Sequence, residues 1–271
     1  PMKGENRILV SFGLRRFKQS RIPGIDALLD VVGLDRSVTT AGQLGYVIAP
    51  RINAAGRIGE SADALRLLLT EDPAEARSLA AQLDATNTLR REEDRRTLDE
   101  ALETLEQRYD AEKDFGVVLA GEGWHPGVIG IVASRVVERI HRPVVMIALG
   151  EDGGRGSARS IPGFDLYEAL ADCAQHLQRF GGHRQAAGMD ILPESVAAFR
   201  ESFNEAARDR LSANDLQPVL RPDLRIDLRD IDLQFVHWLA YLGPHGIGNP
   251  GPLFMACGVG LEEARVVGSG H

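Results

Sequence analysis

The stretch FGGHRQAAGMD, residues 180–190, combines two glycines, a histidine, an arginine and a run of small residues. Gly181 and Gly182 can adopt positive φ and leave backbone N–H groups uncovered, so an anion can approach the main chain closely. His183 and Arg184 add side-chain donors at the same place, and the planar guanidinium group suits phosphate. The stretch therefore predicts a tight turn before a buried strand, or a phosphate-binding turn if other segments supply partners.

The segments around this stretch have the hydrophobic pattern of an α/β domain. Short apolar runs predict strands, and longer runs with helical spacing predict helices between them. We expect strands at 117–120, 144–149, 155–160 and 189–192, and helices at 128–140, 165–177 and 194–211.

Two polar segments in this α/β region are candidates for ligand contact. Residues 121–130, GEGWHPGVIG, cross from a strand to a helix and carry His125, and such crossings often bind ligands. They lack the GxGxxG spacing and the following acidic residue of a dinucleotide site, which excludes NAD binding. In the strand at 155–160, alternation puts Arg155, Ser157 and Arg159 on one face. That face is either a row that recognises an oxyanion or a solvent-exposed edge strand.

The first 70 residues predict four short helices, at 5–17, 25–32, 41–48 and 62–69. Between the third and fourth lies APRINAAGRIG, residues 49–59. We expect a loop here that turns tightly beneath the guanidinium groups of Arg51 and Arg57, with Asn53 between them. An ordinary loop between helices is the alternative.

A long helix is predicted after Asp72 and Pro73, which are a typical N-cap and first helical residue. Residues 74–109 contain no glycine or proline and would extend about 54 Å as one helix. Apolar stripes mark its two ends, whereas residues 90–96 are polar on every face. The pattern is typical of a connector between domains with a solvated middle. Alternatively, its arginines face a nucleic-acid groove.

The last segment predicts the opening of a β-barrel. Leu224, Ile226 and Leu228 alternate as in a strand, residues 233–242 have helical spacing, and residues 253–267 are rich in strand-forming residues. A loop of glycine and proline, residues 243–250, separates the last two.

Composition limits the possible functions. The chain has 271 residues, which suggests two domains or more, and its net charge of −8 gives no global basic field. Phosphate binding must therefore come from local clusters. We expect no membrane segment and no signal segment. Cys173 and Cys257 lack metal-ligand spacing and are expected to be reduced packing residues in a cytoplasmic protein. The abrupt ends suggest a piece of a longer protein.

Several motifs occur in one order: PRINAAGRI, the long helix, GWHPGVIGIVASR, RGSARS, FGGHRQAAGM and LGPHGIGNPGPLF. Together they resemble the RecJ single-strand-specific 5′→3′ DNA exonucleases of the DHH phosphoesterase superfamily. The resemblance implies an α/β fold class with four parts. These are the helical end of a DHH domain at 1–72, a connector helix at 73–110, a DHHA1 domain at 114–212 and the start of an OB-like barrel at 218–271.

The resemblance also implies a chemistry, the metal-assisted hydrolysis of a phosphodiester in DNA repair and recombination. Two Mn²⁺ or Mg²⁺ ions are bound in that family by aspartates and histidines of the DHH domain. This chain has no Asp-His-His triplet or similar cluster, so we expect its metal ligands to lie elsewhere and the chain alone to be inactive. Single-stranded DNA with a 5′ end is the implied substrate, with a helicase and a single-strand-binding protein as partners.

The resemblance assigns roles to particular residues. His183 is the expected catalytic residue, with Gly181 and Gly182 beside the phosphate near the cleavage point. Further phosphate or substrate contacts are expected from Arg57, Ser157 and Arg159 at the 5′-terminal phosphate, and from Arg51, Asn53 and His125.

Three alternatives share parts of this pattern. A DHH-DHHA1 phosphodiesterase for cyclic dinucleotides or short oligonucleotides resembles residues 114–212 but would end there. A non-catalytic Cdc45-like protein would bind nucleic acid without metal ligands. The editing module of an alanyl-tRNA synthetase also has a DHHA1 domain, but the NAAGR segment and the connector helix argue against it.

Overall fold

The computed structural model describes residues 1–260, 262–263 and 265–266. The chain forms two compact units, and each is described by itself. The first contains residues 1–22, 32–49 and the segment from 219 onward, and the second contains residues 23–31 and 50–218. The units therefore do not follow a boundary at residue 72.

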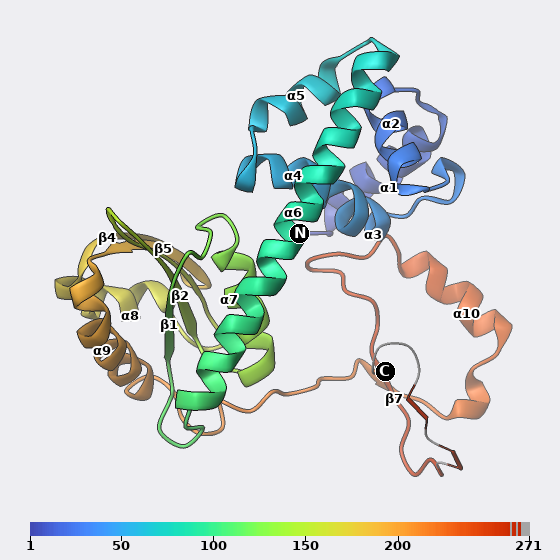
Figure 1. Cartoon of the computed structure of the whole chain (residues 1–271). Helices are drawn as coiled ribbons and strands as arrows, with labels where there is room; N and C mark the ends of the chain where they lie inside the picture. Colours follow the sequence, from blue (N-terminus) through green and yellow to red (C-terminus); the bar gives the residue numbers. More distant parts are fainter. Residues whose placement is uncertain (261, 264, 267–271) are drawn as a thin grey trace. The chain divides into compact units, whose positions relative to one another are not determined.

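A five-stranded sheet is the centre of the second unit (Figure 1). The strand order is β1-β2-β3-β5-β4, in which β1 and β2 are parallel and the other neighbours are antiparallel. The parallel pair is joined by α7 (Ile129–Ile140). The strands are β1 (Val117–Glu122), β2 (Val144–Gly150), β3 (Gly153–Arg159), β4 (Leu177–His183) and β5 (Ala186–Ile191).

Apolar side chains cover both faces of the sheet. On one face, α8 (Leu166–Asp172) and α9 (Val196–Arg208) enclose a core that contains the buried rings of Phe199 and Phe203. On the other face, α7 packs together with the C-terminal half of α6 (Pro73–Arg108). Figure 1 shows this arrangement, with α7 and α6 on one side of the sheet and α8 and α9 on the other. The helix predicted at 165–177 is shorter than expected, because α8 ends at Asp172.

The long helix predicted after residue 72 is confirmed. It is α6, whose N-cap Asp72 accepts a hydrogen bond from the backbone of Ala74 at 2.8 Å. The prediction of a solvated middle is wrong, because the side chains of Asn87, Asp94 and Thr97 are buried there. Their spacing puts them on one helical face, and α7 packs along this part of α6.

The segment at 49–59 was predicted to be a loop, and that prediction is wrong. Residues Ala49–Ile58 form α4, since proline is tolerated in the first helical turn and the alanines that follow favour a helix. Two neighbours complete this end of the unit, α2 (Pro23–Val32) and α5 (Ser61–Leu69). They approach closely at Gly24, where a β-carbon would collide with the backbone of Leu67.

The first unit contains mainly helices and turns. They are α1 (Gly4–Gln19), α3 (Ala41–Gln43), the π-helical turn η2 (Leu44–Ile48) and α10 (Leu233–Leu239), with short 3₁₀ turns. The helix predicted at 233–242 is thus split into α10 and the turn η6 (Ala240–Leu242).

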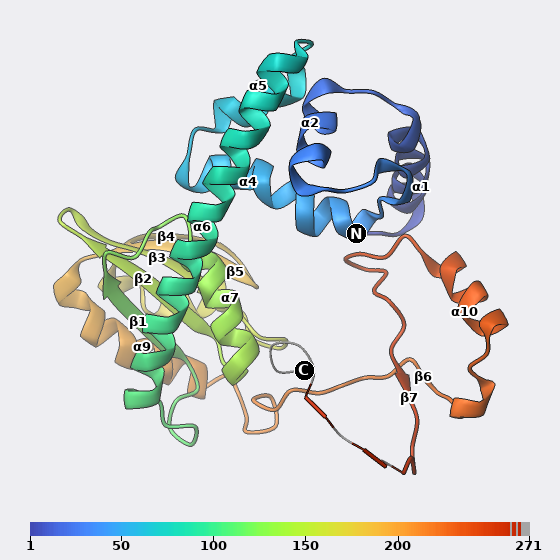
Figure 2. The same ribbon diagram turned by 45° about the vertical axis from the view of Figure 1, so that its right-hand side comes forward.

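The strands of the first unit are shorter than predicted. Within the described part of this unit, only β6 (Leu224–Arg225) and β7 (Phe254–Met255) pair as strands, in parallel (Figure 2). The predicted strand at 224–228 ends early because Asp227 caps a 3₁₀ turn at Leu228–Asp230. Part of the predicted β-rich segment at 253–267 lies outside the described residues. Cys173 is buried as expected, but Cys257 is exposed, so its predicted packing role is wrong.

Among the described residues, no helix combines the length and the apolar character needed to span a bilayer.

Candidate functional site

The stretch at 180–190 is a β-hairpin. Gly181 and Gly182 lie in β4, opposite Gly188 and Ala187 of β5, so they are strand residues and the predicted turn at these glycines is wrong. Only Arg184 and Gln185 separate the two strands. The small residues on both strands let the backbones pair although few large apolar side chains are present. β4 is also an edge strand, because it stands last in the strand order, next to β5.

The two glycines of β4 have different surroundings. Gly182 has a φ of 150°, and a β-carbon there would collide with the backbone of Ala186 and Ala187, so the fold requires glycine. Around Gly181, a β-carbon would have no neighbouring atom within 4 Å among the described residues. Packing therefore does not explain why residue 181 lacks a side chain, and the surface above it is open.

The alternation predicted for residues 155–160 is confirmed. Gly154, Gly156 and Ala158 are buried, and the residues between them point to the opposite face. In the sheet register, Arg159 pairs with Ala186, which in turn pairs with His183. Arg159 and His183 therefore lie in one row, two strands or about 10 Å apart.

The start of α7 lies directly above Ser157 and Arg159. A β-carbon on Gly130 would be 2.7 Å from Nη2 of Arg159 and 2.9 Å from Oγ of Ser157. Arg159 donates from Nη1 to the Ser157 hydroxyl at 3.1 Å and to the Ala158 carbonyl at 2.8 Å. A side chain at position 130 would therefore displace the Arg159 guanidinium group or the Ser157 hydroxyl from this position.

A second guanidinium group, that of Arg57, approaches this pair. Burial lowers the pKa of Arg159, and repulsion from Arg57 lowers it further. Arg57 donates from Nη1 to the carbonyl of Gly127 at 3.1 Å. Within the described part of the chain, none of the hydrogen bonds that the two arginines form goes to a carboxylate, and the nearby Asp94 is paired with Arg135, so both guanidinium groups keep donors for an anion.

The helical conformation of α4 separates the two arginines of its motif. Asn53 and Arg57 are four residues apart, so both lie on the exposed face. Arg51 points to the other side, where Nε forms a 2.7 Å ion pair with Asp84 of α6. The structure therefore places Asn53 beside Arg57 and engages Arg51 in the packing of α4 on α6.

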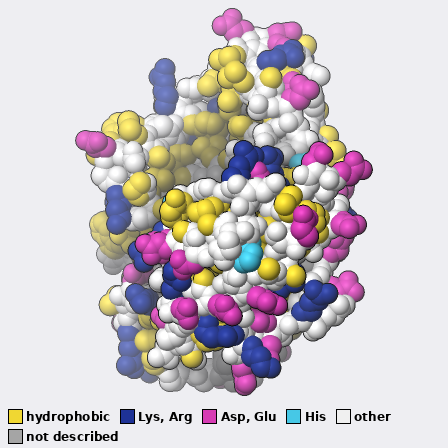
Figure 3. Space-filling model, turned by 90° about the vertical axis from the view of Figure 1, so that its left-hand side faces the viewer, with side chains coloured by type: hydrophobic (Ala, Val, Ile, Leu, Met, Phe, Trp, Pro, Cys, Tyr) yellow, Lys and Arg dark blue, Asp and Glu magenta, His cyan; other side chains and the backbone are white. Residues whose placement is uncertain are grey.

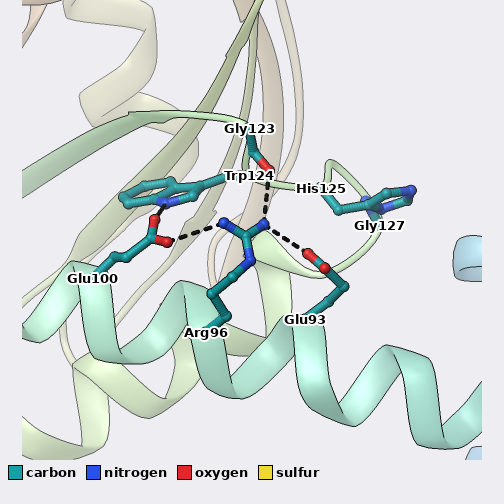
Figure 4. A network of polar contacts seen from close by, with 7 residues as sticks. All are labelled: Glu93, Arg96, Glu100, Gly123, Trp124, His125 and Gly127. Atoms are coloured by element: carbon teal, nitrogen blue, oxygen red, sulfur yellow. Dashed lines mark hydrogen bonds and ion pairs between the residues drawn. The ribbon is translucent and has the colours of Figure 1, made fainter.

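The loop between β1 and α7 is fixed to α6 by a polar network (Figure 4). Trp124 is buried and donates from Nε1 to Oε2 of Glu100 at 2.6 Å. Arg96 donates to the Gly123 carbonyl at 2.9 Å and pairs with Glu100 at 3.0 Å and with Glu93 at 2.8 Å. Gly121 has no room for a side chain beneath the indole ring of Trp124.

This network leaves His125 available on the other side of the loop. In Figure 4 its ring points away from Arg96 and Glu100. Its Nδ1 accepts a hydrogen bond from the backbone N–H of Gly127 at 3.0 Å. His183 makes the corresponding bond in the hairpin, where its Nδ1 accepts from the N–H of Gln185 at 3.2 Å.

A cluster on α6 was missed in the sequence. Asp94, whose side chain is buried, pairs through Oδ2 with Nη2 of Arg135 on α7 at 2.9 Å. Burial raises the pKa of Asp94, and the attraction of Arg135, Arg90 and Arg57 does not cancel this effect. The spacing of Asn87, Asp94 and Thr97 along one helical face was a signal of this buried stripe.

A hollow of about 500 Å³ lies over the sheet beside these residues. We call it the sheet-face hollow. It is lined by Pro126, Ile129, Arg155, Gly156, Ser157, Arg179, Phe180, Gly181, Gly188, Met189 and Asp190. Ser157 and Gly181 thus border a real depression, next to the row of Arg159 and His183. The floor of this depression is formed by small residues, and its other rim is charged.

The electrostatic character of the surface is local. Basic and acidic side chains alternate over the face shown in Figure 3, so no uniform positive field covers it. Among the residues that the structure describes, no group of three or more His, Cys, Asp or Glu side chains could hold a metal ion. The residues of this site therefore do not fit a metal centre and fit anion binding.

Comparison with known proteins identifies the domains. A family described as the DHHA1 domain matches residues 113–209, and one described as the RecJ OB domain matches residues 222–271. The chain is 38% identical over 271 residues to the single-stranded-DNA-specific exonuclease RecJ of Bacillus subtilis, covering 99% of this chain and 34% of that protein. It is 35% identical to the RecJ of Escherichia coli, covering 100% of this chain and 48% of that protein.

Solved structures agree with these matches. The crystal structure of RecJ from Thermus thermophilus in complex with Mn²⁺ superposes with a TM-score of 0.86 at 36% identity, covering 100% of this chain and 39% of that one. Its complex with Mg²⁺ gives a TM-score of 0.83 at 37% identity, covering 94% of this chain and 39% of that one.

The fold and the matches define a protein with a DHHA1 domain followed by an OB domain. Over its whole length the chain corresponds to a segment of the RecJ proteins. It spans between 34% and 48% of the length of these curated relatives.

Proposed function

We propose that this chain is the substrate-holding part of a 5′→3′ exonuclease specific for single-stranded DNA, acting in DNA repair and recombination. The observation that carries the proposal is that Ser157 and Arg159 lie together beneath Gly130, with Arg57 close enough to repel Arg159 electrostatically. Two guanidinium groups and a hydroxyl, none of them hydrogen-bonded to a carboxylate, suit a phosphate with several charged oxygens. The names of the relatives, single-stranded-DNA-specific exonucleases, support the choice of substrate.

We assign the 5′-terminal phosphate to this group of three residues. A terminal phosphate carries more charge than an internal phosphodiester, so two neighbouring arginines favour it over the middle of a strand. Asn53, on the same face of α4 as Arg57, is placed to contact the same end. His125 belongs to the neighbouring loop, which touches α4 at Gly127. Arg51 supports the site indirectly through its pair with Asp84.

His183 and Gly181 are proposed to contact the phosphate near the cleavage point. They lie on the same face of the sheet as Ser157 and Arg159, and His183 is two strands away from Arg159. Gly181 leaves the surface open for a close backbone approach. Gly182 contributes differently, because its conformation makes the pairing of β4 and β5 possible.

The related RecJ structures were solved in complex with Mn²⁺ and with Mg²⁺, which supports a divalent metal as the cofactor of the whole protein. Such ions supply an activated water and stabilise the leaving oxygen. We assign no metal ligand to the described residues, so this chain positions the strand.

The segment from residue 222 is proposed to extend the contact with the strand, as OB domains do. The rings of Trp238 and Tyr241 lie next to each other. Both side chains are largely exposed, and we propose that they stack on bases. We also propose a cytoplasmic location. Because the enzyme needs an unpaired strand, a helicase and a single-strand-binding protein are its expected partners.

Arg159→Ala tests the end pocket. Fluorescence anisotropy with an oligonucleotide carrying either a 5′-phosphate or a 5′-hydroxyl separates end binding from internal binding. The variant should lose most of the preference for the phosphorylated end and keep most of its affinity for the hydroxyl form. Arg210→Ala, which breaks an ion pair with Asp172 on the other side of the sheet, is the matched control. Equal loss with both oligonucleotides would refute the assignment.

A second measurement tests whether this chain binds the DNA without cleaving it. The purified 271-residue chain should bind single-stranded DNA and should not degrade it when Mn²⁺ is added. Degradation that a chelator stops would contradict the view that this chain only holds the substrate.

A further inference from the structure

A charged row borders the sheet-face hollow on the side away from Arg159. Arg155 of β3, Asp190 of β5 and Arg179 of β4 are cross-strand neighbours in the register of the sheet. Nε of Arg155 lies 3.7 Å from Oδ1 of Asp190, and Nε of Arg179 pairs with Oδ2 of the same carboxylate. The Asp190 carboxylate thus pairs with both arginines, and the three side chains together have a net charge of about +1.

The two arginines can bind a further anion. Their side chains are 64% and 73% exposed, whereas that of Asp190 is 23% exposed. Both pairs use Nε, and the terminal nitrogens of Arg155 and Arg179 have no acceptor among the described residues. Asp190 therefore orients two guanidinium groups whose remaining donors border the sheet-face hollow.

Between this row and the row of Arg159 and His183 lies a third row, which is nearly bare. It consists of Ser157, Gly188 and Gly181. A β-carbon on Gly188 would meet no described atom closer than 3.8 Å, and its φ is not in the left-handed region. Neither backbone conformation nor packing therefore requires glycine at position 188. Glycine also weakens the interior of a β-strand, so its presence there needs another explanation.

From this geometry we infer that Arg155 and Arg179 form a second phosphate subsite, which binds an internal phosphodiester of the same DNA strand. This subsite rests on the proposed function. The two charged rows are four residues apart along the strands, about 13 Å, a span that an extended dinucleotide can bridge. The DNA strand crosses the bare row, where Gly188 and Gly181 let the DNA backbone lie against the sheet. Asp190 is a positioning residue for the two arginines.

Oligonucleotides with one neutral methylphosphonate linkage test the subsite. The linkage is moved stepwise along a 5′-phosphorylated strand, and the affinity of the 271-residue chain is measured at each position. The unchanged chain should lose about tenfold in affinity at one internal linkage near the 5′ end. The double variant Arg155→Ala/Arg179→Ala should bind the fully charged strand about tenfold more weakly and lose this sensitivity. Arg210→Ala should keep the profile of the unchanged chain.

Salt dependence gives an independent readout. When a protein neutralises one phosphate fewer on single-stranded DNA, the slope of log affinity against log salt becomes shallower by about 0.7. The double variant should show this reduction with a 5′-hydroxyl strand, which does not use the end pocket. Thermal melting should show that the double variant is folded, since exposed ion pairs contribute little to stability.

A steric variant tests the path of the strand. Gly188→Ala and Gly188→Val should weaken binding progressively without lowering the melting temperature by more than a few degrees. Gly13→Val on α1, where a β-carbon also has open space, is the control and should bind normally.

The outcomes separate this subsite from the proposed function. If the end preference depends on Arg159 but the methylphosphonate profile is the same in the double variant, the second subsite is wrong and the end pocket stands. If Gly188→Val binds as tightly as the unchanged chain, the path across the bare row is wrong. If the unchanged chain shows no affinity for single-stranded DNA, both the function and the subsite are overturned.

Discussion

Arg57 and Gly127 hold α4 and the loop before α7 together by a close backbone contact and a side-chain hydrogen bond. The carbonyl oxygen of Arg57 occupies the space that a β-carbon on Gly127 would need, and Nη1 of Arg57 donates to the Gly127 carbonyl at 3.1 Å. Two motifs that are far apart in the sequence therefore approach each other as closely as their backbones allow. The position of the Arg57 guanidinium depends on this close approach.

Replacing Gly127 by alanine should separate the two segments. A methyl group without space costs about 1–3 kcal/mol of unfolding free energy, and the 5′-phosphate preference should fall with it. Thermal melting and anisotropy measure the two effects. Gly56→Ala is the control, since a β-carbon there meets no described atom within 4 Å and removing a helical glycine stabilises by about 0.5–1 kcal/mol. A Gly127→Ala chain as stable as the unchanged one would contradict the contact.

Trp124→Phe should destabilise the loop between β1 and α7. The variant keeps most of the ring packing but loses the 2.6 Å bond to Glu100, which costs about 1.5–3 kcal/mol because the acceptor is charged. Urea unfolding measures the loss, and hydrogen exchange should be faster at residues 121–127. Glu106→Gln, an exposed change on the same helix, serves as the reference. Unchanged exchange in the loop would show that α6 does not hold it.

The two glycines of β4 should respond in opposite ways to alanine. Gly182→Ala should lower the unfolding free energy by about 1–3 kcal/mol, because its φ and its contact with Ala186 exclude a side chain. Gly181→Ala should leave stability almost unchanged and weaken DNA binding. Melting curves of the two variants, recorded side by side, decide this. The opposite order of stabilities would invalidate the roles given to them.

Asp94→Asn should show a stability difference that depends on pH. Burial raises the pKa of Asp94, so between the ordinary aspartate pKa and this raised value the folded chain binds more protons than the unfolded chain. The stability contributed by Asp94 is therefore fully present below the ordinary pKa and is lost as pH rises through the raised one.

The unfolding free energy of the Asp94→Asn chain, relative to that of the unchanged chain, should thus increase as pH rises from the ordinary aspartate pKa to the raised pKa of Asp94. Above the raised pKa the difference should level off. Urea unfolding of both chains across acidic to neutral pH measures it. Asp99→Asn, an exposed change on the same helix, should show no such rise. A difference that decreases with pH would mean that the pair with Arg135 dominates over burial.

The two cysteines should differ sharply in reactivity. Burial raises the pKa of Cys173 to about 11, so little thiolate exists at neutral pH and reagents cannot reach it. Cys257 is exposed. A disulfide reagent such as DTNB should label one thiol rapidly in the folded chain and the second only after denaturation. Cys257→Ser should abolish the rapid phase, and a rapid phase that persists would contradict the burial of Cys173.

Local sequence patterns correctly predicted the features that are determined by residues close together in the sequence. The alternation of Arg155, Ser157 and Arg159 was correct, because strand geometry alone decides which side chains share a face. The start of α6 was correct for the same reason, since Asp72 and Pro73 are local helix signals. The meeting of Arg57 with Arg159 was expected only from the family resemblance, because nothing local connects α4 with β3.

The features that the sequence did not predict depend on tertiary contacts. The small residues of 49–59 were interpreted as a tight loop, yet Ala54 and Ala55 are buried in packing contacts that favour the helical conformation of α4. Gly181 and Gly182 read as a turn, but pairing with β5 makes them a strand. The helical spacing of Asp94 with Asn87 and Thr97 hinted at a shared face, but only the packing of α7 shows that Asp94 is buried and paired with Arg135. The charged row at Asp190 likewise needs the register of three strands.

The bonds that hold His125 and His183 also determine the proton on each ring. In both residues Nδ1 accepts a backbone N–H, so in the neutral ring the proton resides on Nε2. Each imidazole consequently offers a single uncharged donor, in the tautomer fixed by its own loop. Such a group can hydrogen-bond a phosphate oxygen without adding to the charge of the arginines.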